Sequence, residues 1–154
     1  MLTPRRVRRW SRGAALAETG IIITLLIPIT FAVMDFAGIL YAFQAMQNGV
    51  SQATRYAVTG SSMTDAHGAA MTREQSIRQA MRAVTPGFQL GDDAFTFYDV
   101  STGGSDSGGP NDIVRVTVVY NWQLFTPFLR PFFQSGYVTV RVASTMKNEP
   151  FPNS

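Results

Sequence analysis

The chain has 154 residues, which is enough for one small domain and an anchor but not for two independent cores. It carries 13 basic and 10 acidic residues, but five of the basic ones lie in the first twelve positions, namely Arg5, Arg6, Arg8, Arg9 and Arg12. The net charge of +3 therefore belongs to the N-terminus and predicts no nucleic-acid surface. Cysteine is absent, which excludes disulfides and thiolate metal sites but leaves the compartment open.

A long apolar segment follows this basic leader. It reads TGIIITLLIPITFAVM over residues 19–34 and continues after Asp35 as FAGILYAF to Phe43. Since about 20 helical residues cross a bilayer core of about 30 Å, we expect one transmembrane helix. The arginines flank only its N-terminal side, and the next basic residue is Arg55. The positive-inside rule therefore predicts a cytoplasmic N-terminus, a single membrane span and a C-terminal domain on the outer side of the membrane.

Two alternatives to an anchor remain for this segment. One is a cleaved secretory signal peptide, although the apolar segment is longer than the roughly 7–15 residues usual there. The other is a buried core helix, which the one-sided arginines disfavour.

The junction between leader and apolar segment carries a second pattern. The residues RGAALAE place Gly13 after the basic residues, Ala14 next, and Glu18 at the fifth position of a chain that begins at Ala14. A carboxylate at this depth is costly unless a partner compensates it, so Glu18 is a candidate for contact with another subunit. The alternative is that its side chain snorkels to the cytoplasmic interface.

This junction resembles the cleavage motif of type IV prepilins. The continuation ITFAVMDFAGILYAFQAMQNGVSQATRYAV resembles the N-terminal segment of TadE-like pseudopilins of tight-adherence (Tad, type IVc) pili, with an acidic residue, Asp35, after the apolar run and Arg55-Tyr56-Ala57 closing the helix. The resemblance implies a pseudopilin or minor pilin that a prepilin peptidase processes and that supports assembly of an adhesive pilus. It also implies that Glu18 meets the N-terminal amine of a neighbouring subunit.

The partners that this resemblance implies are the prepilin peptidase, other pilin and pseudopilin subunits, the inner-membrane pilus assembly machinery and membrane lipid. The resemblance also implies that the span lies in the inner membrane and the C-terminal domain in the periplasm, and it allows the pilus or the cell surface as further locations. The competing class is a single-pass envelope protein whose outer domain binds a ligand or cell-wall component without forming a polymer.

A stripe of mostly small residues follows one side of the predicted helix when residues are placed about 100° apart. Its members are Ala17, Gly20, Thr24, Pro28, Asp35, Gly38, Ala42, Ala45, Gly49 and Ala53. Small residues at four-residue spacing let another helix approach closely. We therefore expect packing against another subunit at Asp35, Gly38, Ala42, Ala45 and Gly49, and the TadE-like resemblance adds Glu18, Arg55 and Tyr56 to these contacts. The alternative is that the stripe only reflects the composition of membrane helices.

The rest of the chain predicts a small α+β domain. Thr72 and Gln75 form a possible capping box for a second helix, which Pro86-Gly87 ends. Alternating apolar residues predict strands at 94–100, 113–125 and 137–144. The predicted organisation is a basic leader (1–13), a transmembrane and extended amphipathic helix (14–59) and a periplasmic α+β domain (60–154). We expect a pilin-like domain with a second helix and a three- to four-stranded antiparallel sheet.

Two connections stand out in this domain. The first, GGSDSGGPND, predicts a flexible linker, with a Ca²⁺ contact through Asp106 and Asp112 as the alternative. The second, residues 125–133, is rich in phenylalanine and proline, and reads equally as a lid on the core or as a partner surface.

Catalytic chemistry has few candidates in this sequence. The single histidine, His67, lies in a connection, and no glycine loop is followed by the lysine and helix of a phosphate-binding site. A hydrolase that uses only Asp92, Asp93 and Asp99 is the remaining enzymatic option. We therefore expect no enzyme, no cofactor and no metal site.

Overall fold

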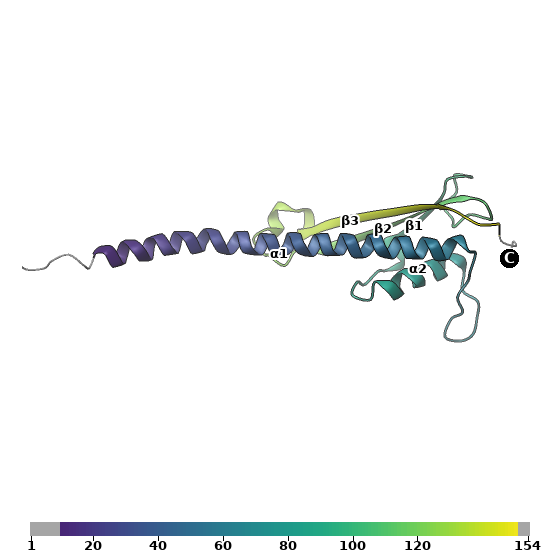
Figure 1. Cartoon of the computed structure of the whole chain (residues 1–154), viewed down its shortest axis with the longest axis horizontal. Coiled ribbons are helices and arrows are strands. Elements are labelled where there is room, and N and C mark those ends of the chain that lie inside the picture. The colour runs from purple at the N-terminus through teal and green to yellow at the C-terminus, as the bar shows by residue number, and fades with distance from the viewer. Residues whose placement is uncertain (1–9, 151–154) are drawn as a thin grey trace, which may run out of the picture.

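The computed structural model describes residues 10–150, so most of the basic leader lies outside the described residues. The chain forms a long helix α1 (Trp10–Val58), a second helix α2 (Arg73–Val84) and three strands, β1 (Phe95–Asp99), β2 (Ile113–Gln123) and β3 (Tyr137–Lys147). Short 3-10 turns lie before β1 and between β2 and β3. The N-terminal half of α1 projects from the rest, and its C-terminal half runs alongside the sheet and α2 (Figure 1). The expected α+β class is confirmed.

Helix α1 begins at Trp10, earlier than the expected start at Ala14. No proline lies between these positions, and a single glycine costs a helix only about 1 kcal/mol. The helix also continues through Pro28. Proline is tolerated inside membrane helices because neighbouring groups compensate for the lost backbone hydrogen bond.

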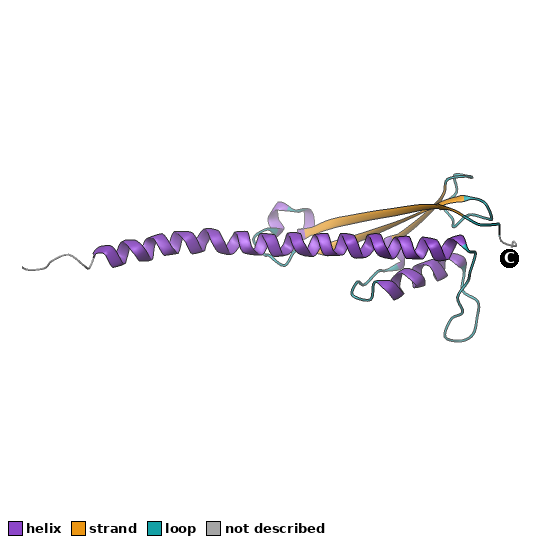
Figure 2. Cartoon of the chain, viewed as in Figure 1, coloured by secondary structure: helices purple, strands orange, loops and turns teal. Residues whose placement is uncertain are grey.

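The three strands form one antiparallel sheet in the order β1-β2-β3 (Figure 2). The register pairs Phe97 with Val116, and Val118 with Val142. These side chains lie on the buried face, and the residues between them face outward. The predicted alternation is therefore confirmed, with three strands rather than four among residues 10–150.

The core lies between this sheet face and the two helices. From α1 it receives Ala42, Met46, Val50, Ala53 and Ala57, and from α2 Ile77 and Met81. The spacing of three or four residues on α1 keeps its contributions on one face of the helix. The predicted capping box of α2 is present, because the amide of Gln75 donates to the Thr72 hydroxyl at 3.2 Å and the Gln75 side chain accepts from the Thr72 amide at 3.0 Å.

The end of the domain far from the projecting helix is tied by one arginine. Arg73 donates to the carbonyl of Ala57 at 2.8 Å and to that of Gly108 at 2.6 Å. The Asn148 side chain also donates to the carbonyl of Gly109 at 2.7 Å. The glycine-rich connection, expected to be a flexible linker, is thus bonded to Arg73 of α2 and to Asn148 of the C-terminal segment. Through Arg73 it is also joined to the end of α1.

Candidate membrane and assembly interface

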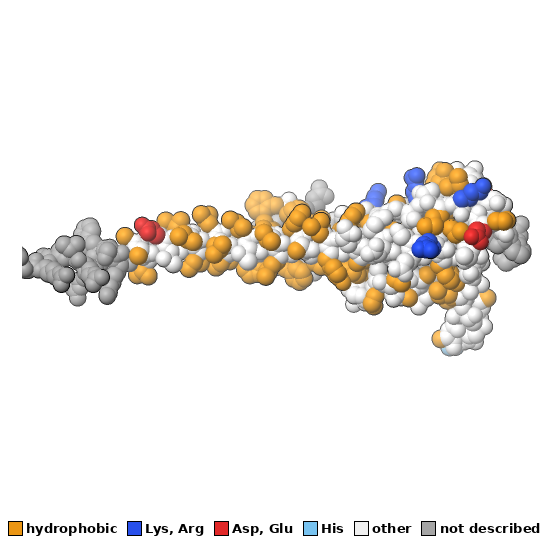
Figure 3. Space-filling model, in the orientation of Figure 1, with side chains coloured by type: hydrophobic (Ala, Val, Ile, Leu, Met, Phe, Trp, Pro, Cys, Tyr) orange, Lys and Arg blue, Asp and Glu red, His pale blue; other side chains and the backbone are white. Residues whose placement is uncertain are grey.

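The projecting half of α1 exposes apolar side chains on every side. Residues 13–27 are all exposed, and large apolar side chains remain exposed up to Phe43. Figure 3 shows these hydrophobic side chains covering the projecting helix. Within the described residues, α1 is the one helix long and apolar enough to cross a membrane. A helix that is apolar all round needs a lipid or protein environment, which agrees with a single-pass anchor.

Hydroxyl groups on this segment are satisfied within the helix. Thr19, Thr24 and Thr30 donate to the carbonyls of Ala15, Gly20 and Leu26 at 2.8, 2.7 and 2.9 Å. Each threonine thereby hides its polar group from an apolar environment, where an unpaired hydroxyl is costly. These three threonines are therefore compatible with burial in lipid.

The predicted processing residues lie near the start of α1. Gly13, Ala14 and Glu18 are all exposed, and a side chain added at Gly13 would meet no atom within 4 Å. Glu18 has no hydrogen bond or ion pair with any other described residue. The proposed cleavage position and the carboxylate are thus both accessible on an isolated chain.

Asp35 lies where the projecting helix meets the domain, and it is 2% exposed. Its Oδ1 accepts from the amide of Phe125 at 2.7 Å, and its Oδ2 accepts from the amide of Thr126 at 3.0 Å. One carboxylate therefore binds two consecutive backbone amides just after β2 ends. Charge-assisted bonds of this kind are about twice as strong as neutral ones. We call this arrangement the Asp35 clamp.

The clamp gives Asp35 a partner within its own chain. Asp35 was predicted to contact another subunit, and that contact stays a prediction, although both carboxylate oxygens are bonded within the chain. A partner for this carboxylate was expected, since an unpaired one is costly in an apolar helix. The partner itself lies about 90 positions away in an irregular loop and has no sequence signal of its own.

The small residues of the outer helix also face the chain's own domain. A Cβ added at Gly38 would lie 2.5 Å from Cζ2 of Trp122, and one at Gly49 would lie 2.7 Å from Cγ2 of Thr85. Ala42 is fully buried in the core and Ala45 packs against its edge. Within the chain these small residues allow close approach of β2 and of the end of α2, and packing against another subunit stays a prediction. Of the remaining predicted contacts, Arg55 is exposed and Tyr56 is half-buried.

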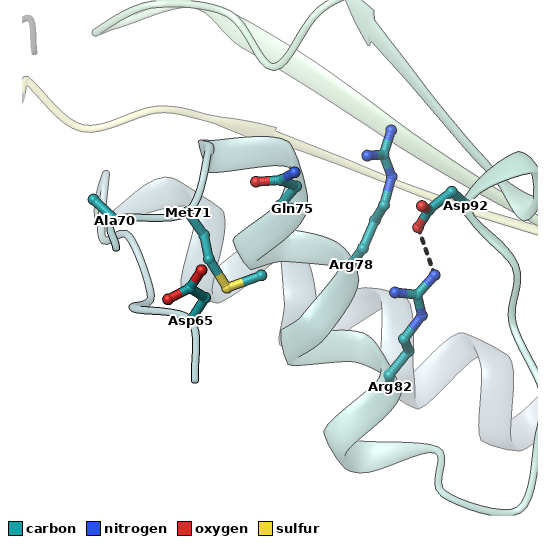
Figure 4. A pocket seen from close by; sticks show the side chains of 7 residues that line it. All are labelled: Asp65, Ala70, Met71, Gln75, Arg78, Arg82 and Asp92. Carbon is teal, nitrogen blue, oxygen red and sulfur yellow. Dashed lines mark hydrogen bonds and ion pairs between the residues drawn. The ribbon is translucent and has the colours of Figure 1, made fainter. Parts of the chain in front are cut away.

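A shallow hollow of about 270 Å³ lies beside α2 (Figure 4). Its lining residues are Asp65, Ala70, Met71, Gln75, Arg78, Arg82 and Asp92. Arg82 donates to Asp92 at 2.6 Å, and this hydrogen bond holds the pKa of Asp92 below its ordinary value. The guanidinium groups of Arg78 and Arg82 also lie over the rings of Phe97 and Phe95, at 5.2 and 5.7 Å. Both cations therefore help to hold α2 against β1.

Three further carboxylates singled out in the sequence, those of Asp99, Asp106 and Asp112, have partners in their own turns and loops. Asp99 accepts from the Ser101 amide and the Thr102 hydroxyl, both at 2.7 Å. Asp106 and Asp112 accept from the amides of Gly108 and Gly109 within the glycine-rich loop. Among residues 10–150, no group of three or more His, Asp or Glu side chains is placed to hold a metal ion.

These features define a class of protein, in which a helix able to span a membrane continues into a small α+β domain and forms part of that domain's core. Within it, the family model described as TadE-like protein matches residues 13–55, so the predicted resemblance is confirmed for this segment. The match covers most of α1, from Gly13 to Arg55, and ends before the rest of the domain. No curated protein and no solved structure matches the chain.

Proposed function

We propose that this chain is a minor pilin, or pseudopilin, that supports assembly of a Tad pilus. In this proposal a prepilin peptidase cuts between Gly13 and Ala14, and α1 holds the product in the inner membrane with its N-terminus in the cytoplasm and the α+β domain in the periplasm. The observation that carries the proposal is the TadE-like match, which begins at Gly13, immediately after the basic residues.

The geometry of α1 supports an assembly role. From Gly13 to Ile27 every residue is exposed, so this part of the helix is open to lipid and to other pilin subunits. Glu18 is the one charged residue between Gly13 and Met34. An accessible carboxylate in an apolar helix suits pairing with a cation in the membrane, such as a subunit's terminal amine. We propose a structural rather than enzymatic role, with the inner-membrane pilus machinery as a further partner.

Processing is the sharpest test of this proposal. In cells that express the cognate prepilin peptidase, N-terminal sequencing should find a mature protein that begins at Ala14. Gly13→Val should block this cleavage, because it places a branched side chain at the scissile position. Gly20→Val is the matched control, since a side chain at either glycine meets no atom within 4 Å.

An intact leader in the unmodified protein would overturn the proposal. It would favour the alternative of a plain envelope anchor with a ligand-binding outer domain, because such a protein has no use for cleavage after Gly13. Equal cleavage of the two valine variants would show that Gly13 does not define the site.

A further inference from the structure

The connection between β2 and β3 exposes an unusual amount of aromatic surface. Residues 125–133 read FTPFLRPFF, and the exposed fractions of Phe125 and Phe132 are 69% and 81%. Phe128 and Phe133 are exposed by 45% and 42%. A contiguous apolar patch of this kind marks a binding surface. We call residues 125–133 the aromatic loop.

The aromatic loop lies beside the part of α1 where the projecting helix enters the domain (Figure 1). The Asp35 clamp fixes its first two amides to the helix, and Trp122, whose ring lies 5.8 Å from that of Phe125, packs on Gly38. Residues 15–34 of α1 are about 20 in number and span about 30 Å, the thickness of a bilayer core. The loop is therefore held at the level where the helix would leave the membrane.

The chemistry of the loop suits a membrane surface. It contains no acidic residue, and its one charged side chain is Arg130, which donates through Nε to the carbonyl of Leu124 at 3.0 Å. Arginine pairs well with the phosphate groups of lipids, and phenylalanine is one of the apolar residues through which interfacial helices enter the boundary between headgroups and acyl chains.

The backbone of the loop is also prepared for an environment with little water. Besides the two amides in the clamp, those of Leu129, Phe132 and Phe133 donate to the carbonyls of Thr126, Leu129 and Arg130 at 3.1, 3.0 and 3.1 Å. Pro127 and Pro131 have no amide hydrogen to satisfy. Unpaired backbone groups are what keeps most irregular loops away from lipid. In this loop, five of the seven backbone N–H groups are bonded.

We propose that the aromatic loop enters the outer leaflet of the membrane that α1 crosses, at the level of the headgroups. Its phenylalanine rings then lie against the acyl chains and Arg130 lies near the lipid phosphates. The loop and α1 then form two points of attachment, and the domain is held at a fixed orientation on the membrane. The proposal rests on α1 as a membrane anchor and does not depend on a role in pilus assembly.

Because the chain has no cysteine, single labels can be placed without removing native residues. Phe132→Cys reports on the loop, and its 81% exposure means that the substitution leaves the core intact. Val100→Cys is the control, since Val100 is also an exposed apolar residue but lies at the opposite end of the sheet, where its amide donates to Ile113. Each variant is labelled with the fluorophore NBD and placed, one copy per disc, in lipid nanodiscs of phosphatidylcholine and phosphatidylglycerol.

The label at position 132 should emit at shorter wavelength than the label at position 100. It should also be quenched severalfold more strongly by lipid with a nitroxide at carbon 5 of the acyl chain, and more weakly by aqueous iodide. Equal lipid quenching at the two positions would overturn the proposal. The proposal would also be overturned if the label at position 132 were protected from iodide only after other subunits had been added to the discs. The loop would then bind protein rather than lipid. Since each disc holds a single copy and no pilus protein, failure here leaves the proposed pilus function untouched.

Discussion

Asp35 is a buried carboxylate whose two oxygens are bonded by backbone amides. Both of its oxygens accept hydrogen bonds, from Phe125 and Thr126, and the 2% exposure keeps water from competing. Removing one partner from a buried polar pair leaves the other unsatisfied, which costs more than the bond itself contributes. The clamp should therefore be sensitive to small chemical changes in this one side chain.

Asp35→Asn provides the first prediction. The amide group of asparagine has one acceptor oxygen, so its NH2 must face a backbone N–H, and at least one charge-assisted hydrogen bond is lost. We expect the free energy of unfolding of the domain in detergent to fall by about 1.5–3 kcal/mol. Hydrogen exchange of the Phe125 and Thr126 amides should accelerate. Glu18→Gln is the control, and equal exchange in the two variants would contradict the clamp.

Gly38 tests close packing at a second position on the same helix. An alanine Cβ there would lie 2.5 Å from the ring of Trp122, which cannot yield as a flexible chain would. Overpacking of this kind costs about 1–3 kcal/mol, which outweighs the gain of about 1 kcal/mol from replacing a helical glycine with alanine. Gly38→Ala should therefore lower stability and shift Trp122 fluorescence in a Trp10→Phe background.

Gly20→Ala is the matched control for this variant, since nothing lies within 4 Å of its added Cβ. It should leave stability unchanged or raise it slightly. If the two variants proved equally stable, Trp122 would not pack on the helix as described.

At the scale of elements, the turn after β1 depends on an ionised carboxylate. The hydrogen bond from the Thr102 hydroxyl, helped by the Ser101 amide, holds the pKa of Asp99 below its ordinary value. A carboxyl group with a lowered folded-state pKa contributes stability above its unfolded pKa of about 3.9, and this stability is lost as the pH falls through the folded value.

The third prediction follows from that sign. Asp99→Asn should lower the melting temperature at pH 6, where the native carboxylate is ionised. The difference between the two proteins should shrink as the pH falls below about 4, because Asp99 of the unfolded protein then binds a proton while the native carboxylate does so only at lower pH. A difference that stayed constant from pH 6 to pH 3 would show that the charge of Asp99 does not stabilise the turn.

The elements that the sequence predicted well are those with local signals. Thr72 and Gln75 mark the start of α2 within a single turn, and the alternation of Val114, Val116 and Val118 identifies the buried face of β2. The neighbours of α1 were harder to predict. A stripe of small residues indicates close approach but not by which element, so Gly38 was assigned to another subunit rather than to Trp122 of the same chain.

The candidate interface likewise contains features that could be predicted from the sequence and contacts that could not. The accessibility of Glu18 follows from its place in an apolar segment, and the TadE-like resemblance was carried by contiguous residues 13–55. The Asp35 clamp and the Arg73 contacts join residues far apart in sequence, and both involve backbone atoms of loops. The pattern of residue types along the sequence carries no signal for such contacts, because every residue except proline has the same amide and carbonyl groups.

For the molecule as a whole, the two carboxylates of α1 have separate tasks. Glu18 and Asp35 are 17 residues apart, which is about 25 Å along the helix. Asp35 is satisfied inside its own domain, whereas Glu18 has no partner among the described residues. The arrangement separates an end of α1 that is open to other molecules from an end that maintains the fold.

The last prediction tests this separation, and it rests on the proposed pilus function. Glu18→Ala should be processed normally and should leave the stability of the domain unchanged, because the residue is far from the core. It should nevertheless reduce co-purification with pilin subunits from detergent-solubilised membranes, since an ion pair in an apolar environment cannot form without it. Asp35→Asn should show the opposite pattern, with a weakened domain and a mature N-terminus that still begins at Ala14. Leu16→Ala, which changes an exposed apolar residue near Glu18, controls for general disturbance of the helix. If Glu18→Ala and Leu16→Ala recovered equal amounts of pilin, the carboxylate would be no more than a side chain that reaches the cytoplasmic interface.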